Sequence, residues 1–406
     1  MALIVQKYGG SSVADAEKIK NVASRVAKAK ITGNQVVVVV SAMGHTTDDL
    51  IKLAYQVNEQ PGDRELDVLL STGEIVSSTL LALALESLGY KAVSLTGAQA
   101  GIQTDSSYNR ARILRVDSKR VVSELEKGNI VIVAGFQGVT QEMDITTLGR
   151  GGSDTTAVAL AASLNAEICQ MYTDVEGVYT ADPNLISEAR KLKDIGYEEM
   201  LELASYGAKV MHNRAVELGE LYNVPILVAS SFSDKQGTII CKEASMEVKN
   251  KARGIAYDTN VSKVTIVGVP DHPGIAAAIF EPLARANISV DTIVQNASIN
   301  NITDLTFTIA RNDLIKAMSI VEPVAKSVGS KQCVTDSTLA KVSIVGTGMQ
   351  NTPGYAAKMF SVLHEQSINI QLITTSEIRI TCIISEDRVK DAVHALHQAF
   401  ELEKET

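Results

Sequence analysis

The chain has 406 residues, of which 45% are hydrophobic and 21% are charged, so it holds enough apolar material for folded cores. At roughly 150 residues per domain, this length predicts two or three domains. A formal net charge of −9 argues against a general nucleic-acid binder, and the apolar runs at 36–40 and 79–85 are too short to span a bilayer, so we expect no nucleic acid and no membrane as partners.

Residues 1–240 alternate short β-branched runs with longer helical patterns. This alternation is typical of βαβ units and of a mainly parallel sheet covered by helices. In the first predicted helix, at 15–30, Ile19, Val22 and Val26 share one face. The predicted strands are 3–7, 35–41, 91–95, 129–135, 167–172 and 224–229, and the other predicted helices are 74–88, 154–164 and 208–221.

Beyond residue 240 the pattern changes to a polar segment followed by a repeat. Residues 241–254 lack periodicity, which predicts a linker. The sequence from Lys263 then aligns with the sequence from Lys341, each copy in the order strand, Pro-Gly turn, helix, strand, strand, helix. The first copy has a candidate fourth strand at 331–336, whereas the second ends in a charged tail. We expect residues 253–258 to supply the strand that the second copy lacks.

The N-terminal residues and the cysteines favour a reducing cytoplasm. MALIVQKYGG lacks the basic, apolar and small-residue regions of a secretory signal. The spacing of the four cysteines fits neither a zinc site nor a disulfide framework. They are Cys169, Cys241, Cys333 and Cys382.

Two glycine-rich loops are candidates for phosphate binding. KYGGSS at 7–12 follows the first strand, where Lys7 and the amides of Gly9 and Gly10 would meet at the ligand-binding edge of the sheet. The second loop, within 146–163, leads into a small-residue helix whose first turn contains Asp154. Neither loop matches GxxxxGK[ST] or GxGxxG. Each loop also has a purely structural interpretation. The first could be a tight turn with a surface lysine, and Asp154 in the second could be a helix cap.

Three further pieces are weak signals when each is taken alone. The segment 172–184 places Asp174, Tyr179 and Asp182 after a predicted strand, and it could equally be a solvated acidic turn. Glu74 and Lys209 each lie near a predicted helix start, where a surface charge is the ordinary interpretation.

Taken together, these segments resemble the aspartokinases of the amino-acid-kinase superfamily. KYGGSS, VVVVVSAMGHTTDDL, STGE, AGFQGV, TTLGRGGSDTTA, YTDVEGVYTADP and GAKVMH occur in the order and spacing of that family. The repeat resembles a pair of ACT regulatory domains. The resemblance implies an α/β fold with an amino-acid-kinase-like, mainly parallel sheet sandwiched by helices, followed by two ferredoxin-like (βαββαβ) ACT domains. The expected domains are 1–243 (catalytic), 244–259 (linker and a strand for the second ACT domain), 260–337 and 338–406 (ACT domains).

The resemblance also implies a reaction, the transfer of the ATP γ-phosphoryl group to the β-carboxylate of L-aspartate. A carboxylate is already ionised at pH 7, so no general base is needed. Lys7 and Lys209 would then neutralise the transferring group together with the Mg²⁺ of Mg-ATP, and Asp154 would orient the lysines. The other residues implied at the ATP site are Gly9, Gly10, Ser41, Tyr172, Thr173, Asp174, Tyr179 and Asp182.

For the acceptor, the resemblance places Arg150 on a substrate carboxylate and Glu74 on the ammonium group. It also implies contacts from Thr47, Gly152 and Ser153.

In the repeats, Pro273-Gly274 and Pro353-Gly354 precede helices whose free N–H groups suit an amino-acid carboxylate, although proline often simply starts a helix. The resemblance implies lysine, threonine or both as effectors. It further implies a homo-oligomer, or an α2β2 assembly with a shorter regulatory chain, formed through the ACT domains. The expected effector residues are Asp271, Gly274, Ile275, Ala276, Asp291, Gln295, Asn369, Ile370 and Glu377.

Two alternatives stay open at this point. A kinase of the same superfamily acting on acetylglutamate, glutamate or a nucleoside monophosphate would lack the repeat, which argues against it. A catalytically inactive amino-acid sensor would be favoured by loss of Lys7, Asp154 or Lys209, and all three residues are present.

Overall fold

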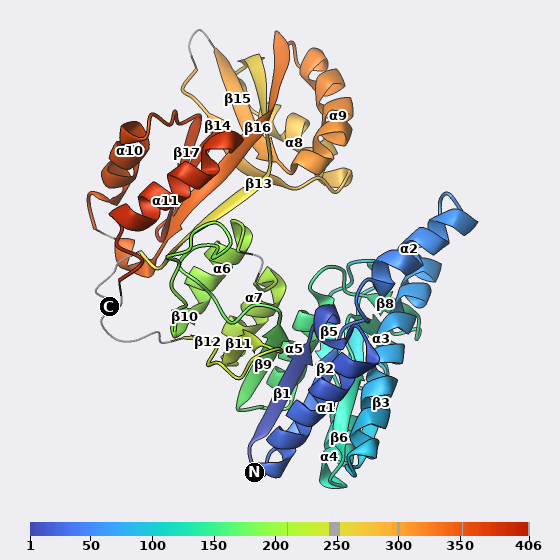
Figure 1. The fold of residues 1–406 in the computed structure, drawn as a ribbon. Coiled ribbons are helices and arrows are strands. Elements are labelled where there is room, and N and C mark those ends of the chain that lie inside the picture. The colour runs from blue at the N-terminus through green and yellow to red at the C-terminus, as the bar shows by residue number, and fades with distance from the viewer. Residues whose placement is uncertain (209, 243–251, 299–300, 351, 405–406) are drawn as a thin grey trace. The chain divides into compact units, whose positions relative to one another are not determined.

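The structure, a computed structural model, describes residues 1–208, 210–242, 252–298, 301–350 and 352–404 (Figure 1). The chain divides into two compact units. The first consists of Met1–Tyr179 and Lys191–Val248, and the second of Thr180–Arg190 and Lys249–Thr406.

An eight-stranded sheet forms the centre of the first unit, in the order β10-β12-β11-β9-β1-β2-β6-β3. All neighbours pair in parallel except β11 and β12. The valines 36–40 are completely buried, as expected for a parallel strand with both faces covered. The strands are β1 (Leu3–Tyr8), β2 (Gln35–Val40), β3 (Ala92–Leu95), β6 (Ile130–Ala134), β9 (Ile168–Thr173), β10 (Asp194–Gly196), β11 (Ile226–Ser230) and β12 (Thr238–Cys241).

Helices and a small second sheet complete the first unit. Asp15 caps the first helix by accepting a hydrogen bond from the Lys18 amide. The second sheet has the order β5-β4-β7-β8, with β4 (Ile102–Thr104), β5 (Ile113–Val116), β7 (Gln137–Val139) and β8 (Ile145–Thr147). The helices are α1 (Ala16–Ile31), α2 (Thr46–Val57), α3 (Asp63–Ser87), α4 (Lys119–Glu126), α5 (Gly152–Ser163), α6 (Tyr197–Ser205) and α7 (Asn213–Leu221).

Some elements differ from those expected from the sequence. The helix predicted at 74–88 begins at Asp63, because the apolar pattern of Leu66, Leu69 and Leu70 extends it toward the N-terminus. The helix predicted at 208–221 begins only at Asn213. The short strands of the second sheet were not expected, since three or four residues are too few for a periodic pattern.

Helix α3 is the one helix among the described residues that is long and apolar enough to cross a membrane. Half of its apolar window is nevertheless buried inside the unit. It also carries the buried carboxyl of Asp67, which accepts hydrogen bonds from Thr147 N (2.7 Å) and Thr147 Oγ1 (2.6 Å). A carboxyl group bonded inside the protein is typical of a core helix.

The second unit contains one antiparallel six-stranded sheet, in the order β14-β15-β13-β16-β18-β17. Helices α8 and α9 belong to one apolar core, and α10 and α11 belong to another. The strands are β13 (Gly254–Pro270), β14 (Val290–Gln295), β15 (Ile302–Ile309), β16 (Gln332–Val345), β17 (Leu372–Thr375) and β18 (Arg379–Ser385). The helices are α8 (Ile275–Arg285), α9 (Leu314–Ser327), α10 (Tyr355–Glu365) and α11 (Val389–Ala399).

The long strands β13 and β16 each serve both repeats. The beginning of β13, residues 254–258, pairs with residues 341–345 of the second copy, and its later part pairs with residues 332–336 of the first. The first repeat therefore has the strand order βαββαβ within its own sequence, whereas the second repeat lacks its last strand and pairs instead with residues 254–258, as expected from the sequence. The predicted fold class, a mainly parallel sheet covered by helices and followed by two ferredoxin-like domains, is confirmed.

The segment Thr180–Arg190 belongs to the second unit, although the sequence suggested a continuous first domain over 1–243. Ala181 and Ile186 are buried in the same apolar core as α10 and α11. Thr180 Oγ1 lies 2.9 Å from Nε2 of the buried His397, and the Thr180 carbonyl accepts a hydrogen bond from Ile255 N. Only a contact between distant segments reveals this insertion.

Candidate active site

An ion pair lies at the carboxyl edge of the parallel sheet. Lys7, near the end of β1, places Nζ 2.6 Å from Oδ1 of Asp154 in the first turn of α5. Both side chains are largely buried, so the pair is shielded from solvent. Gly151 precedes α5 with φ +69°, and a Cβ there would lie 2.2 Å from the ring of His212. A glycine is therefore needed at position 151, immediately before the first residue of α5.

The KYGGSS loop lies next to this pair. Gly9 N donates to the Tyr172 carbonyl (3.2 Å), and Ser41 N donates to the Tyr8 carbonyl (3.1 Å), so the ends of β9, β1 and β2 meet there. A Cβ at Gly10 would lie only 2.8 Å from the Ala42 carbonyl oxygen. The loop therefore packs tightly against the residue that follows Ser41.

Gly10→Ala and Gly9→Ala form a matched pair of substitutions in this loop. Gly10→Ala should destabilise the protein by roughly 1–3 kcal/mol, because the backbone at Ala42 must move. A Cβ at Gly9 meets nothing closer than 3.6 Å, the flexible end of Lys7, so Gly9→Ala should leave the melting temperature nearly unchanged. Thermal denaturation of both variants checks this, and equal losses of stability would contradict the packing described.

Glu74 is a buried carboxyl group on α3. Its Oε1 accepts a hydrogen bond from Ala42 N (3.0 Å), while Oε2 is buried without a hydrogen-bond partner in the described part of the chain. Burial raises the pKa of Glu74 from its ordinary 4.5 to about 7. Because Ala42 also contacts the KYGGSS loop, Glu74 lies close to that loop. An unsatisfied acceptor in this place suits a cationic donor from a ligand.

The remaining residues expected at the acceptor surround the start of α5 and the start of α2. Arg150 is exposed and has no hydrogen-bond or ion-pair partner within the described ranges, so its guanidinium is available to an anion. Ser153 is buried beside Gly135, where a Cβ would lie 2.9 Å from the Ser153 side chain. Gly152 packs tightly against Phe136 and Leu148. Thr47 is partly exposed on α2.

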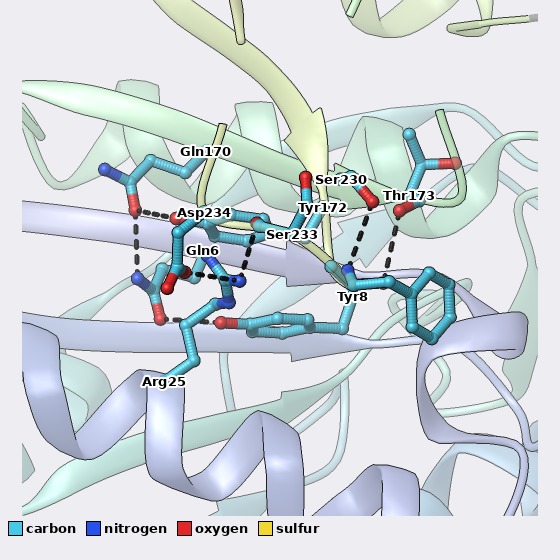
Figure 2. A network of polar contacts seen from close by, with 11 residues as sticks. Gln6, Tyr8, Arg25, Gln170, Tyr172, Thr173, Ser230, Ser233 and Asp234 are labelled. Atoms are coloured by element: carbon cyan, nitrogen blue, oxygen red, sulfur yellow. Dashed lines mark hydrogen bonds and ion pairs between the residues drawn. The ribbon is translucent and has the colours of Figure 1, made fainter. Parts of the chain in front are cut away.

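Tyr172 meets the KYGGSS loop through its backbone carbonyl, whereas its ring is buried. Its side chain is 8% exposed and stacks on Tyr8, with ring centroids 5.0 Å apart. Arg25 of α1 lies over the Tyr172 ring, with its guanidinium carbon 5.0 Å from the ring centroid. Figure 2 shows both residues within one network of polar contacts. The ring therefore belongs to the core under α1, and the sequence missed this because stacking partners lie far apart along the chain.

The other residues expected at the nucleotide divide between the two units. Thr173 Oγ1 donates to Asp174 Oδ1 (2.9 Å), and Tyr179 pairs with Lys191 in an isolated bridge. Burial, followed by the charge of Glu176, raises the pKa of Tyr179. Asp182 belongs to the second unit, where Oδ2 accepts from Tyr257 OH (3.1 Å). Lys209 lies outside the described residues.

The expected effector residues fall into two groups. In the first repeat, Gly274 starts α8 with φ +93°, Ile275 is buried, Ala276 is exposed, and Gln295 Nε2 lies 3.5 Å from Asp271 Oδ1. Asp291 forms an ion pair with the buried Lys341 of the other repeat, a partner 50 positions away that no local pattern indicates.

In the second repeat, Glu377 lines a surface pocket of about 480 Å³. Gln350, Thr352 and Ser376 also line it, and Gln350 Nε2 donates to Glu377 Oε2 (2.6 Å). Asn369 is exposed, and Ile370 packs against the core of this repeat. The structure therefore brings Glu377 to a pocket but does not place Asn369 or Ile370 among its lining residues.

Known protein families match the N-terminal and the C-terminal parts of the chain separately. Residues 2–230 match the amino acid kinase family, and residues 264–323 and 342–400 each match an ACT domain. The chain is 52% identical to an aspartokinase of Pseudomonas aeruginosa, with 99% of this chain and 98% of that protein covered. It is 50% identical to aspartokinase 2 of Bacillus subtilis, with 100% and 99% covered.

Solved structures have the same fold. Escherichia coli aspartokinase III, in complex with aspartate and ADP, is 24% identical and superposes with a TM-score of 0.79 over 98% of this chain and 99% of that one. Aspartate kinase from Synechocystis is 42% identical, with a TM-score of 0.55 over 98% of this chain and 70% of that chain.

Proposed function

Because this chain belongs to the aspartokinases, kinases of the amino acid kinase family with two C-terminal ACT domains, we propose that it phosphorylates L-aspartate. The γ-phosphoryl group of ATP would pass to the β-carboxylate, giving 4-phospho-L-aspartate and ADP, the first step towards lysine, threonine and methionine. The main support is the shielded Lys7–Asp154 pair at the sheet edge, close to the orphan acceptor of Glu74. We place the reaction in the cytoplasm.

Phosphoryl transfer depends on positioning and on neutralising charge, and the residues present suit both. Asp154 holds the Lys7 ammonium at the edge of the sheet, where it would meet the ATP phosphates. The amides of Gly9 and Gly10 and the residue Ser41 would line the phosphate side. Lys209, Thr173, Asp174 and Tyr179 would complete the nucleotide site, to which Tyr172 would contribute its backbone. Asp182 is left out of this site, because its carboxylate accepts a hydrogen bond from Tyr257 in the second unit.

The aspartate substrate would be bound by one positively charged and one negatively charged side chain. The free guanidinium of Arg150 suits the bidentate binding of a carboxylate. The buried Oε2 of Glu74 suits the α-ammonium, whose three donors could satisfy it. Thr47, Gly152 and Ser153 would restrict the space for the side chain.

Mg²⁺ is expected to arrive with ATP. Within the described ranges no group of three or more His, Cys, Asp or Glu residues could hold a metal ion. Mg²⁺ usually keeps several waters and is bound largely by substrate phosphates, so it would be held mainly by the ATP phosphates at this edge of the sheet. When bound there, the ion would supply further neutralisation of phosphate charge.

The second unit would carry the regulation. We propose that 1–243, apart from Thr180–Arg190, form the catalytic domain, 244–259 the linker and a strand for the second ACT domain, and 260–337 and 338–406 the ACT domains. Lysine, threonine or both would bind there and change turnover. The chain would associate through these domains, as a homo-oligomer or with a shorter regulatory chain.

A coupled assay of ADP release tests the proposed function. Mg-ATP is supplied with L-aspartate, L-glutamate or N-acetylglutamate, each with and without lysine, threonine and the two combined. Turnover confined to aspartate and suppressed by an effector is the expected result. Turnover with another acid would refute the acceptor site, and absence of turnover with all three would refute the kinase assignment.

Glu377→Ala tests the regulatory part. Glu377 lines the pocket of the second repeat and accepts from Gln350. A hydrogen bond to a charged group contributes about 1.5–3 kcal/mol, so we expect the inhibitory concentration of the effector to rise about tenfold or more. Inhibition curves at fixed substrate measure this, and an unchanged curve would remove Glu377 from the effector site.

A further inference from the structure

A second cavity lies in the first unit between α1 and the chain that follows β11. Its volume is about 390 Å³. The cations Lys18, Arg25 and Lys28 and the hydroxyls of Ser12, Ser231 and Ser233 line it. None of these residues is assigned to the proposed kinase reaction, so the cavity stands independently of that function.

The charge of this cavity is opposite to that of the whole chain. The net charge of the protein is −9, whereas the ionisable residues of the lining are three cations and one carboxylate, Asp234. Asp234 pairs with Arg25 (3.0 Å), but its side chain is 80% exposed. Lys18 lies 3.7 Å from Asp15, whose side chain is also exposed. Such exposed pairs contribute little, so an anion in the cavity would meet a positive surface.

Arg25 is held in place before any ligand binds. Its Nη2 donates to the Ser233 carbonyl (2.9 Å) and to Asp234 Oδ1, and its guanidinium lies over the Tyr172 ring (Figure 2). Tyr172 is itself fixed by stacking on Tyr8. A guanidinium fixed in this way loses little freedom on binding an anion, which favours affinity.

The hydroxyl groups complete the set of donors. Ser233 Oγ is buried and has no hydrogen-bond partner in the described part of the chain, so rotation about χ1 toward a ligand would break no hydrogen bond. Ser12 Oγ donates to Ser231 Oγ (2.8 Å), and Ser231 Oγ donates to the Thr173 carbonyl (3.1 Å), so Ser233 is the hydroxyl that is free to donate to a ligand. Three cations together with the Ser233 hydroxyl match a phosphate group, which carries up to two charges and three acceptor oxygens, better than a single carboxylate.

We propose that this cavity binds a phosphate-bearing small molecule. Its volume lies within the roughly 300–1,000 Å³ of small-molecule sites, which leaves room for an organic body beside the phosphate. The exposed ring of Phe232, with Lys18 Nζ 5.9 Å from its centroid, offers an apolar wall for that body.

Calorimetric titration of the full chain with inorganic pyrophosphate tests this proposal. All variants carry Lys7→Ala, so that the candidate active site lacks its main cation. The pair Lys18→Gln/Lys28→Gln removes two cavity charges. The matched control Lys20→Gln/Lys30→Gln removes two charges from the same helix outside the cavity. We expect the dissociation constant to rise about tenfold or more in the first and less than about twofold in the control.

Two further measurements make the result specific. Ser233→Ala preserves every charge and should still weaken pyrophosphate binding about threefold, because one donor is lost. Citrate, a polycarboxylate, should bind more weakly than pyrophosphate. No heat with pyrophosphate, equal weakening in both double variants, or equal affinity for citrate would each overturn the proposal. Thermal denaturation confirms that the variants are folded.

Discussion

Lys7→Ala should lower kcat for aspartate phosphorylation about 10³-fold at saturating ATP. Lys7 Nζ lies 2.6 Å from Asp154 in a largely buried pair, so its charge is fixed and weakly screened. A preorganised donor aimed at charge that develops in the transition state typically contributes 10²–10³ in kcat. The loss should therefore appear in kcat and not only in the KM for ATP. Steady-state kinetics over a full range of ATP concentrations separate the two.

Lys20→Ala is the control for Lys7→Ala. Lys20 is exposed on α1, so its removal should change kcat less than about twofold. Asp154→Asn should also lower kcat, since the lysine would lose the anion that holds it. If Lys7→Ala retains kcat and raises only the KM for ATP, Lys7 binds the ground state and has no special role in the transition state.

Glu74→Gln should raise the KM for aspartate about 100-fold while changing the KM for ATP far less. The buried Oε2 has no partner in the described part of the chain, and an amide can neither neutralise an ammonium group nor accept as strongly. Because burial raises the pKa of Glu74 to about 7, the aspartate KM of the unmodified protein should itself rise as the pH falls through 7. Kinetics between pH 6 and 8.5 measure both effects.

The same substitution should stabilise the ligand-free protein at high pH. Glu74 has a folded-state pKa of about 7 and an ordinary value of 4.5, so the folded state favours the protonated form. The unfolded state then loses its proton first, and stability falls as the pH rises from 4.5 through 7, by on the order of 3 kcal/mol. Glu74→Gln removes this cost. Its melting temperature at pH 8 should therefore exceed that of the unmodified protein, and the difference should disappear near pH 4.5.

Asp67→Asn is the matched control on the same helix. Asp67 is also buried, but Thr147 and Asn109 donate hydrogen bonds to both of its oxygens. Asp67→Asn should lower the melting temperature, because the amide nitrogen of asparagine is itself a donor and would face the donors that now bond to a carboxylate oxygen. The aspartate KM should change little. A gain in stability for Asp67→Asn, or none for Glu74→Gln, would contradict the contrast between a satisfied and an unsatisfied buried carboxyl group.

The larger elements could be predicted from the sequence because their patterns are local. The valine run of β2 indicates a strand buried on both faces, and the 3.6-residue period of α1 indicates a helix buried on one face. Each pattern lies within one segment of the chain. The two copies of the repeat, which begin at Lys263 and Lys341, indicated two similar domains because each copy carries the same local pattern. The short strands β4, β5, β7 and β8 escaped prediction, since each has only three or four residues, too few for a periodic pattern.

The candidate site was accessible from the sequence only as a set of loops. Lys7 and Asp154 each had an ordinary structural interpretation, and their pairing at 2.6 Å depends on β1 and α5 meeting at one sheet edge. The burial of Tyr172 between Tyr8 and Arg25, and the ion pair of Asp291 with Lys341, join segments that no local pattern connects.

The class of each unit, the existence of the repeat and the glycine-rich loops could be inferred from the amino-acid sequence, because periodicity and turn chemistry act between near neighbours in the chain. Which charged groups are paired, which are buried and which lack a hydrogen-bond partner became visible only in the folded chain. In the folded chain, burial raises the pKa of Glu74, the Tyr172 ring is part of the core, and Thr180–Arg190 belongs to the second unit. Burial and electrostatic interactions depend on distance in space, and for residues far apart in sequence that distance exists only once the chain has folded.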